Sequence, residues 1–209
     1  MIRSAIKSGR GDMGKAARLK KVEKAELLRL DFGCGPHKRE GFKGVDQYPF
    51  DGAVDFVMNI GDDRWPWKDA TVEEAHASHF LEHLTASQRI HFCNELYRVL
   101  RLDGACSIIV PHWASHRAYG DPTHQWPPVS EMWFMYLNAD WRASQAPHTD
   151  ARWSKSGFTC NFEATWGYSL RQDLLSRNQE YQQFAIANYK EVATDLIATI
   201  TKRAIPEKA

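Results

Sequence analysis

The chain has 209 residues, a formal net charge of +1, 43% hydrophobic residues and 25% charged residues. This composition is typical of a globular domain and lacks the global charge of a polyanion-binding protein. No apolar run approaches the roughly 18 residues that span a bilayer, and the N-terminus has no apolar secretory segment, so we expect a cytoplasmic protein. The four cysteines are widely spaced without a Cys-x-x-Cys pair, which predicts free thiols.

The beginning of the chain is basic. The first 29 residues carry nine Lys or Arg and three Asp or Glu. We treat residues 1–26 as a basic extension and residues 27–209 as one domain. Such an extension is usually solvated, but a basic arm that contacts nucleic acid is the alternative.

An apolar run that ends in Gly-x-Gly is the most informative motif. Residues 27–32 predict a strand, and residues 33–35 read Gly-Cys-Gly. Glycines permit positive φ and let backbone N–H groups approach a ligand. The next apolar run, 41–46, ends in Asp46, whose carboxylate can accept hydrogen bonds from both hydroxyls of a ribose. The two signals predict a nucleoside-cofactor site at the carboxyl ends of parallel strands, with an ordinary tight turn as the alternative.

The rest of the first half alternates strand and helix patterns. Strands are predicted at 54–58, 72–77 and 105–110, and a helix at 87–100. The gap between Gly35 and Asp46 is too short for a full crossover helix. We therefore expect a loop in place of the first helix.

Residues 112–157 show no clear periodicity but hold five tryptophans and four histidines. A segment of this length inside a compact domain is usually functional, and its aromatic content argues against disorder. We expect it to bind substrate and to include a short helix over 130–137. Beyond it, 158–168 predict a strand and 179–190 a helix, whereas 195–202 fit either a strand or a continuation of that helix.

These motifs together resemble the class I S-adenosylmethionine-dependent methyltransferases, and most closely the small methyltransferase type 11-like group. Residues 30–35 are similar to the first cofactor motif of that family, Asp46 to its ribose-binding acid, and residues 77–84 and 96–111 to the segments around its fourth and fifth strands. The resemblance covers less than half of the chain. It implies an α/β, Rossmann-like, seven-stranded, mostly parallel sheet with flanking helices, a shortened first helix and an insertion after the fifth strand. It also favours a final strand at 195–202.

The resemblance implies S-adenosylmethionine as the cofactor. The residues it implies for the cofactor site are Asp31, Gly33, Cys34, Gly35, Asp46, Asn59, Ser78 and His79. Asp31 has a second interpretation, as a cap of the loop. Asn59 stands where the family usually has Asp, and either its amide oxygen or Asp62 could accept the adenine amino group.

Methyl transfer depends mainly on positioning, and it needs a general base only when the acceptor starts protonated. The candidate bases follow the fifth strand and are Asp121 or His124 first, then His112. A Pro-fixed turn capped by Asp121 is the alternative. We expect the insertion to close over the cofactor, with these three side chains inside and Trp113 and Trp126 as walls.

Residues 79–83 read His-x-x-Glu-His, which on a helix places two imidazoles on one face for zinc. The methyltransferase resemblance accounts for the same residues, and no third ligand is identifiable by spacing. We therefore expect no metal.

We expect an enzyme that methylates a small-molecule or sugar-like acceptor. The Asn/Asp-Pro-Pro-Tyr motif for exocyclic amines of DNA is absent after the fourth predicted strand. The alternatives are a nucleic-acid methyltransferase that uses the basic arm and the tryptophans, a non-catalytic cofactor-binding protein, and a zinc hydrolase. The sequence gives no sign of a membrane partner and does not indicate an oligomeric state.

Overall fold

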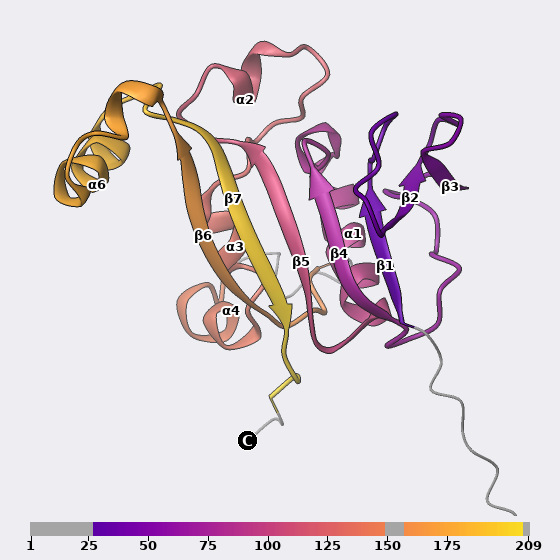
Figure 1. Ribbon diagram of the computed structural model, residues 1–209. Helices are drawn as coiled ribbons and strands as arrows, with labels where there is room; N and C mark the ends of the chain where they lie inside the picture. The colour runs from indigo at the N-terminus through magenta and orange to yellow at the C-terminus, as the bar shows by residue number, and fades with distance from the viewer. Residues whose placement is uncertain (1–26, 149–156, 207–209) are drawn as a thin grey trace, which may run out of the picture.

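The computed structural model describes residues 27–148 and 157–206. Its strands form one seven-stranded sheet in the order β3-β2-β1-β4-β5-β7-β6 (Figure 1). The strands are Leu28–Phe32 (β1), Lys43–Asp46 (β2), Val54–Val57 (β3), Val72–Ser78 (β4), Leu100–Pro111 (β5), Phe162–Leu170 (β6) and Ala193–Lys202 (β7). β7 pairs antiparallel with β5 and β6, and the other neighbouring strands pair in parallel. The predicted mostly parallel sheet and the predicted final strand are both confirmed.

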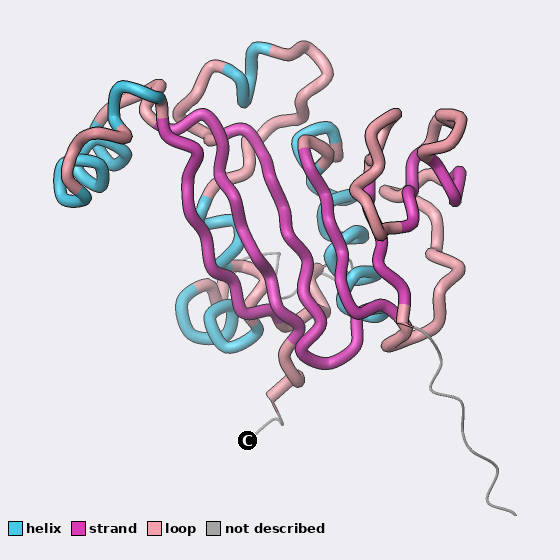
Figure 2. The backbone as a smooth tube through the Cα atoms, viewed as in Figure 1, coloured by secondary structure: helices cyan, strands magenta, loops and turns pink. Residues whose placement is uncertain are grey.

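Three of the described helices cover one face of this sheet. The helices are Ala86–Val99 (α1), Arg117–Gly120 (α2), Glu131–Met135 (α3), Ala139–Gln145 (α4) and Gln179–Asn188 (α6), with single 3₁₀ turns at Leu81–His83 (η1) and Gln172–Leu174 (η2). Helices α1, α3 and α4 cover the same face, and no described helix lies over the other face (Figures 1 and 2). None of the helices described is long and apolar enough to cross a membrane.

The core lies between the sheet and these helices. Phe32 of β1 packs against Trp65 and Phe92, with ring centroids 4.5 and 5.3 Å apart. Side chains alternate along the strands, so that Ile108 is buried while its neighbour Ser107 is partly exposed. Parallel sheets are usually buried on both faces and read as continuous apolar runs. Here the alternation reflects a sheet that the described helices cover on one side.

The short first connection is confirmed as a loop, because residues 33–42 join β1 to β2 without a helix. The predicted start of the fifth strand was wrong. β5 begins at Leu100, directly after α1, and Asp103 at φ +60° lies inside it. Pairing with β4 shifts register between Leu100 and Ala105. The turn signal at Asp103-Gly104 therefore marks an irregularity within a strand and not the start of one.

The start of the sixth strand also differs from the prediction. β6 begins at Phe162 and not at 158, because the preceding backbone bonds to helices. The N–H of Thr159 donates to Asn94 of α1, and the carbonyl of Cys160 accepts from Arg142 of α4. The predicted short helix at 130–137 is confirmed as α3. The basic extension at 1–26 and the insertion's residues 149–156 lie outside the described residues.

Candidate functional site

A cavity of about 520 Å³ opens at the carboxyl ends of β1, β2, β3 and β4. Its walls come from Gly33, residues 46–50 after β2, residues 58–61 after β3, residues from 79–88 after β4, and Thr123 of the insertion. Ligands of open α/β sheets bind at this edge, where neighbouring connections diverge. The cavity is therefore the candidate functional site.

The floor of the cavity needs glycine at position 33. Gly33 has φ +64°, and a Cβ atom there would lie 2.4 Å from Cδ2 of Phe80 and 2.8 Å from its Cβ. Phe80 could not swing away from a contact so close to its own backbone. The N–H of Gly33 donates to the carbonyl of Val45 over 2.8 Å, which ties the loop to β2. The loop thus presents bare backbone at the cavity.

Asp46 joins two loops at the end of β2. It is only 8% exposed. Its Oδ2 accepts from the N–H of Gly35 at 2.9 Å, and its Oδ1 accepts from the N–H of Tyr48 at 3.0 Å. Each carboxylate oxygen can accept two hydrogen bonds. Asp46 can therefore hold both loops and still accept from a ligand in the cavity that it lines.

The loop after β3 is closed by its own side chains. Asn59 accepts from the N–H of Gly61 at 3.2 Å and donates to Asp62 at 2.9 Å. Asp62 also accepts from Gln88 at 2.8 Å. Of the two residues considered for the adenine contact, Asn59 lines the cavity, whereas Asp62 serves to fix Asn59 and Gln88.

The remaining predicted cofactor residues divide into two groups. Gly33, Asp46, Asn59 and His79 line the cavity, whereas Asp31, Cys34, Gly35 and Ser78 are not among its walls. Asp31 is buried, which raises its pKa, and it accepts from the N–H of Arg39 at 2.7 Å. This is the loop-capping role. Burial also raises the pKa of Cys34 to about 11, so its thiol is protonated at neutral pH.

The cysteines have the free thiols that the sequence predicts. All four are free, and three are buried.

The predicted general bases are separated by the fold. Asp121 accepts from the N–H and the hydroxyl of Thr123 at 2.8 and 2.7 Å, as a turn cap, and its side chain is 47% exposed. His112 is buried beside Glu131 in a second cavity of about 360 Å³. Only His124 reaches the edge of the main cavity, where its ring centroid lies 4.7 Å from that of His83.

The described residues of the insertion do not close over the main cavity as expected. Thr123 is the one described residue of the insertion that lines the main cavity. Trp126 is 80% exposed, and Trp113 lines the second cavity, so neither forms a wall of the main cavity.

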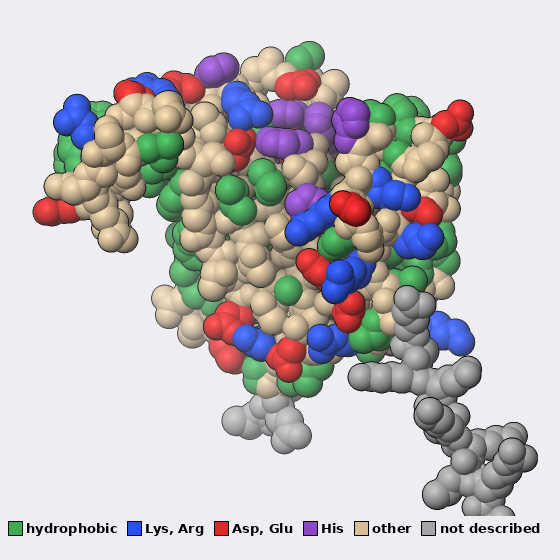
Figure 3. All heavy atoms as spheres, viewed as in Figure 1, with side chains coloured by type: hydrophobic (Ala, Val, Ile, Leu, Met, Phe, Trp, Pro, Cys, Tyr) green, Lys and Arg blue, Asp and Glu red, His purple; other side chains and the backbone are tan. Residues whose placement is uncertain are grey.

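Several histidines gather where β4 and β5 end (Figure 3). His79 follows the end of β4 with φ +51°, whereas His83 is the last residue of η1. The His-x-x-Glu-His motif therefore does not place its imidazoles on one helix face. Nδ1 of His79 lies 3.2 Å from Oε1 of Glu82, and this hydrogen bond raises the pKa of His79. From the sequence, Glu82 and His83 were assigned to the methyltransferase motif in preference to a zinc motif. The spacing gave no sign that they would approach His124.

The sequence matches no known family model and no curated protein. Solved structures share its fold. A SAM-dependent methyltransferase from Archaeoglobus fulgidus is 17% identical, with a TM-score of 0.57 over 86% of this chain and 87% of that chain. A putative methyltransferase from Haloferax volcanii, solved with the activator Trm112, is 13% identical, with a TM-score of 0.50 over 88% of this chain and 85% of that chain. These likenesses confirm the predicted methyltransferase fold, and they do not identify the type 11-like group.

Proposed function

We propose that this protein is an S-adenosylmethionine-dependent methyltransferase. The observation that carries the proposal is the meeting of Gly33 and Asp46, from paired strands, at one cavity. Bare backbone beside a carboxylate at a strand end suits a nucleoside with a polar tail. The fold that the chain shares with a methyltransferase supports the same assignment.

The residues of the cavity fit this cofactor. Asp46 would accept hydrogen bonds from the ribose hydroxyls, the backbone at Gly33 would lie along the amino-acid part, and residues 58–61 would face the adenine. The volume of about 520 Å³ is within the range of small-molecule sites, roughly 300–1,000 Å³. When bound, the cofactor supplies a methyl group on a positively charged sulfur.

We infer a small-molecule acceptor at the end of the cavity formed by His79, His83 and Thr123. Phe80 and Leu84 are apolar residues that line the cavity beside them. In-line placement of the acceptor is the main contribution of the protein to such a transfer. His124 stands behind His83 and is the candidate for the acceptor's proton. Asp121 would act on this end only through Thr123, and His112 is too far removed in the fold to join it.

Calorimetry with S-adenosylhomocysteine tests the proposal. The full chain should bind it, and Asp46→Ala should weaken binding at least about tenfold, because the ribose contact and the loop anchor are both lost. Asp51→Ala, an exposed acid in the next turn, is the matched control and should leave the affinity unchanged. Absence of binding to the unaltered chain, or equal affinity in both variants, would refute the cofactor assignment.

A further inference from the structure

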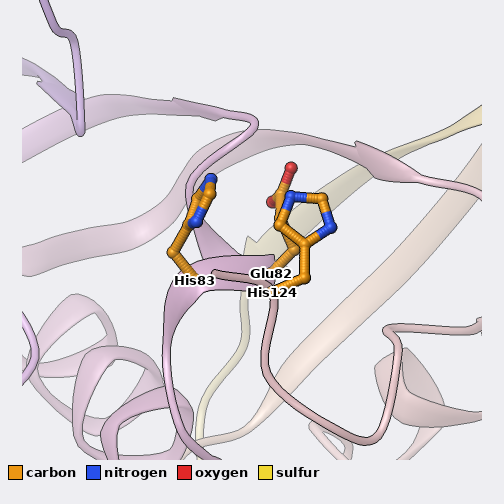
Figure 4. Close-up of side chains that lie close together, drawn as sticks. All are labelled: Glu82, His83 and His124. Atoms are coloured by element: carbon orange, nitrogen blue, oxygen red, sulfur yellow. The ribbon is translucent and has the colours of Figure 1, made fainter. Parts of the chain in front are cut away.

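Three potential metal ligands meet at the edge of the cavity. Glu82 and His83 lie on η1 and His124 in the insertion, and one ligand atom of each lies within 4.8 Å of the others. Figure 4 shows the Glu82 carboxylate between the two imidazole rings. The third ligand that sequence spacing could not identify is therefore supplied by the fold.

The carboxylate of Glu82 is buried and half satisfied. Glu82 is 4% exposed. Its Oε1 is bonded to His79, whereas its Oε2 is buried without a hydrogen-bond partner among the described residues. A buried carboxylate oxygen without a partner is strongly destabilising. A cation held between Glu82, His83 and His124 removes this penalty.

Hydrogen bonds fix which nitrogen of His124 can bind a metal. Its Nδ1 lies 3.3 Å from the carbonyl oxygen of Ala118. A carbonyl only accepts, so this nitrogen carries the proton. In the neutral ring, Nε2 is then the electron-pair donor.

The same reasoning applies to His83 through a relay. Nδ1 of His83 lies 3.0 Å from the hydroxyl oxygen of Thr123, and that hydroxyl donates to Asp121 over 2.7 Å. Because the hydroxyl hydrogen is given to Asp121, Nδ1 of His83 must donate to Thr123. Nε2 of His83 is again the electron-pair donor. An imidazole whose second nitrogen donates to a fixed acceptor is the usual arrangement of a metal-binding histidine.

We propose that Glu82, His83 and His124 bind a divalent transition-metal ion, zinc by the chemistry of its ligands. Two imidazoles and one carboxylate suit zinc, whereas magnesium and calcium prefer oxygen ligands alone. Three protein ligands leave a coordination position for water or for an oxygen of a bound molecule. A bound metal would occupy Nε2 of His124, so the role of base proposed above for His124 applies to the metal-free protein alone. Metal binding does not depend on the proposed methyl transfer.

Metal content tests the site directly. The full chain is stripped with a chelator, dialysed and titrated with zinc chloride and, separately, with cobalt chloride, without cofactor. We expect about one equivalent of zinc per chain and the absorption bands of four-coordinate cobalt. His83→Ala and His124→Ala should each lose both signals. His116→Ala, an exposed histidine paired with Glu191, is the matched control and should keep them.

Each outcome decides the proposal. Circular dichroism establishes that a variant is folded before its metal content is compared, and Glu82→Gln, which keeps the side-chain shape, gives a third independent loss. Absence of saturable zinc binding in the unaltered chain overturns the site, as does full binding in folded His83→Ala or His124→Ala. Binding of S-adenosylhomocysteine, measured separately, shows whether the proposed function fails or stands apart from the metal site.

Discussion

The backbone N–H of Gln125 donates a 2.8 Å hydrogen bond to the carbonyl of Glu82. This bond attaches the insertion to η1, and the neighbouring residues His124 and His83 face each other as a result. Arg89 strengthens the attachment, since its guanidinium donates to the carbonyl of Gln125 over 3.0 Å. The arrangement at the cavity edge therefore depends on hydrogen bonds between two segments that are far apart in the sequence.

Arg89 should be essential for this arrangement. It is 1% exposed and also donates to the carbonyls of Leu81 and Pro127. Arg89→Met keeps much of the apolar volume but leaves these carbonyls unpaired. We expect urea denaturation to show a loss of about 2–4 kcal/mol in the free energy of unfolding. The folded fraction should also lose zinc affinity.

The control for this change is Arg171→Met. Arg171 forms an exposed ion pair with Asp173, and such pairs contribute little to stability. Equal losses in the two variants would contradict the role assigned to Arg89.

Comparing alanine variants of two glycines in one loop distinguishes the cost of overpacking from the cost of backbone strain. Gly33 and Gly35 both have positive φ, but only Gly33 meets the Phe80 side chain. Gly35→Ala should lower the free energy of unfolding by about 1–2 kcal/mol, the cost of a left-handed non-glycine residue. Gly33→Ala adds overpacking of roughly 1–3 kcal/mol and should be clearly less stable. Chemical denaturation of both variants is the measurement, and equal stability would mean that Phe80 moves aside.

Asp55 should make stability depend on acidity. Its carboxylate accepts from Lys38 at 2.7 Å and from the N–H of Gly44 at 2.8 Å, and the Lys38 hydrogen bond lowers its pKa from 3.8 to about 2. Because the pKa of Asp55 is lower in the folded state than in the unfolded state, its charged carboxylate stabilises the fold. This stabilisation is fully present above the pKa of the unfolded state, and it is lost as the pH falls to the pKa of the folded state. Because Asp55 is exposed and solvent screens its ion pair, Asp55→Asn should cost only about 0.5–1 kcal/mol at pH 7.

Urea denaturation at several pH values tests this prediction. The difference between Asp55→Asn and the unaltered chain should persist down to about pH 4 and shrink from there toward pH 2. Asp51→Asn, an exposed acid, serves as the control. A difference that stays constant through this range would assign the effect to packing and not to charge.

Thr123 is not a proposed metal ligand, but its hydrogen bond to His83 should raise the zinc affinity of the site. Thr123→Val keeps the shape but removes the hydroxyl that links Asp121 to His83. Loss of such a supporting hydrogen bond usually weakens metal binding about 10–100-fold. Competition with a chelator measures the change, and Thr199→Val on an exposed position of β7 is the control. Unchanged zinc affinity in Thr123→Val would exclude the relay.

The parts of the fold that could be predicted are those that local sequence determines. The Gly33 turn and the carboxylate of Asp46 come directly after predicted strands, so their meeting at one cavity could be predicted. The sequence 195–202 fits the periodicity of a strand and that of a helix equally well. Pairing with β5 and β6 makes this segment a strand. Asp103-Gly104 has the composition of a turn, but the two residues lie within β5 as an irregularity of the strand.

The acceptor side could not be predicted in the same way. The position of His124 depends on the buried guanidinium of Arg89 and on the N–H of Gln125, and neither contact has a spacing rule. Trp126 was expected to form a wall of the cavity. The backbone carbonyls on either side of it are instead held by Arg89, and the indole is left 80% exposed. In a segment without periodicity, long-range hydrogen bonds decide which side chains face the site.

The face of the sheet that no described helix covers affects which amino-acid replacements its strands tolerate. In β5, Cys106 and Ile108 are fully buried, whereas Ser107 between them is partly exposed. Ser107 should accept threonine, glutamine or lysine with little effect, whereas its neighbours should accept only residues of similar volume. In a saturation library of β5, positions that tolerate many replacements should therefore alternate with positions that tolerate few. The survival of the variants alone would then show which face of the strand packs against the core.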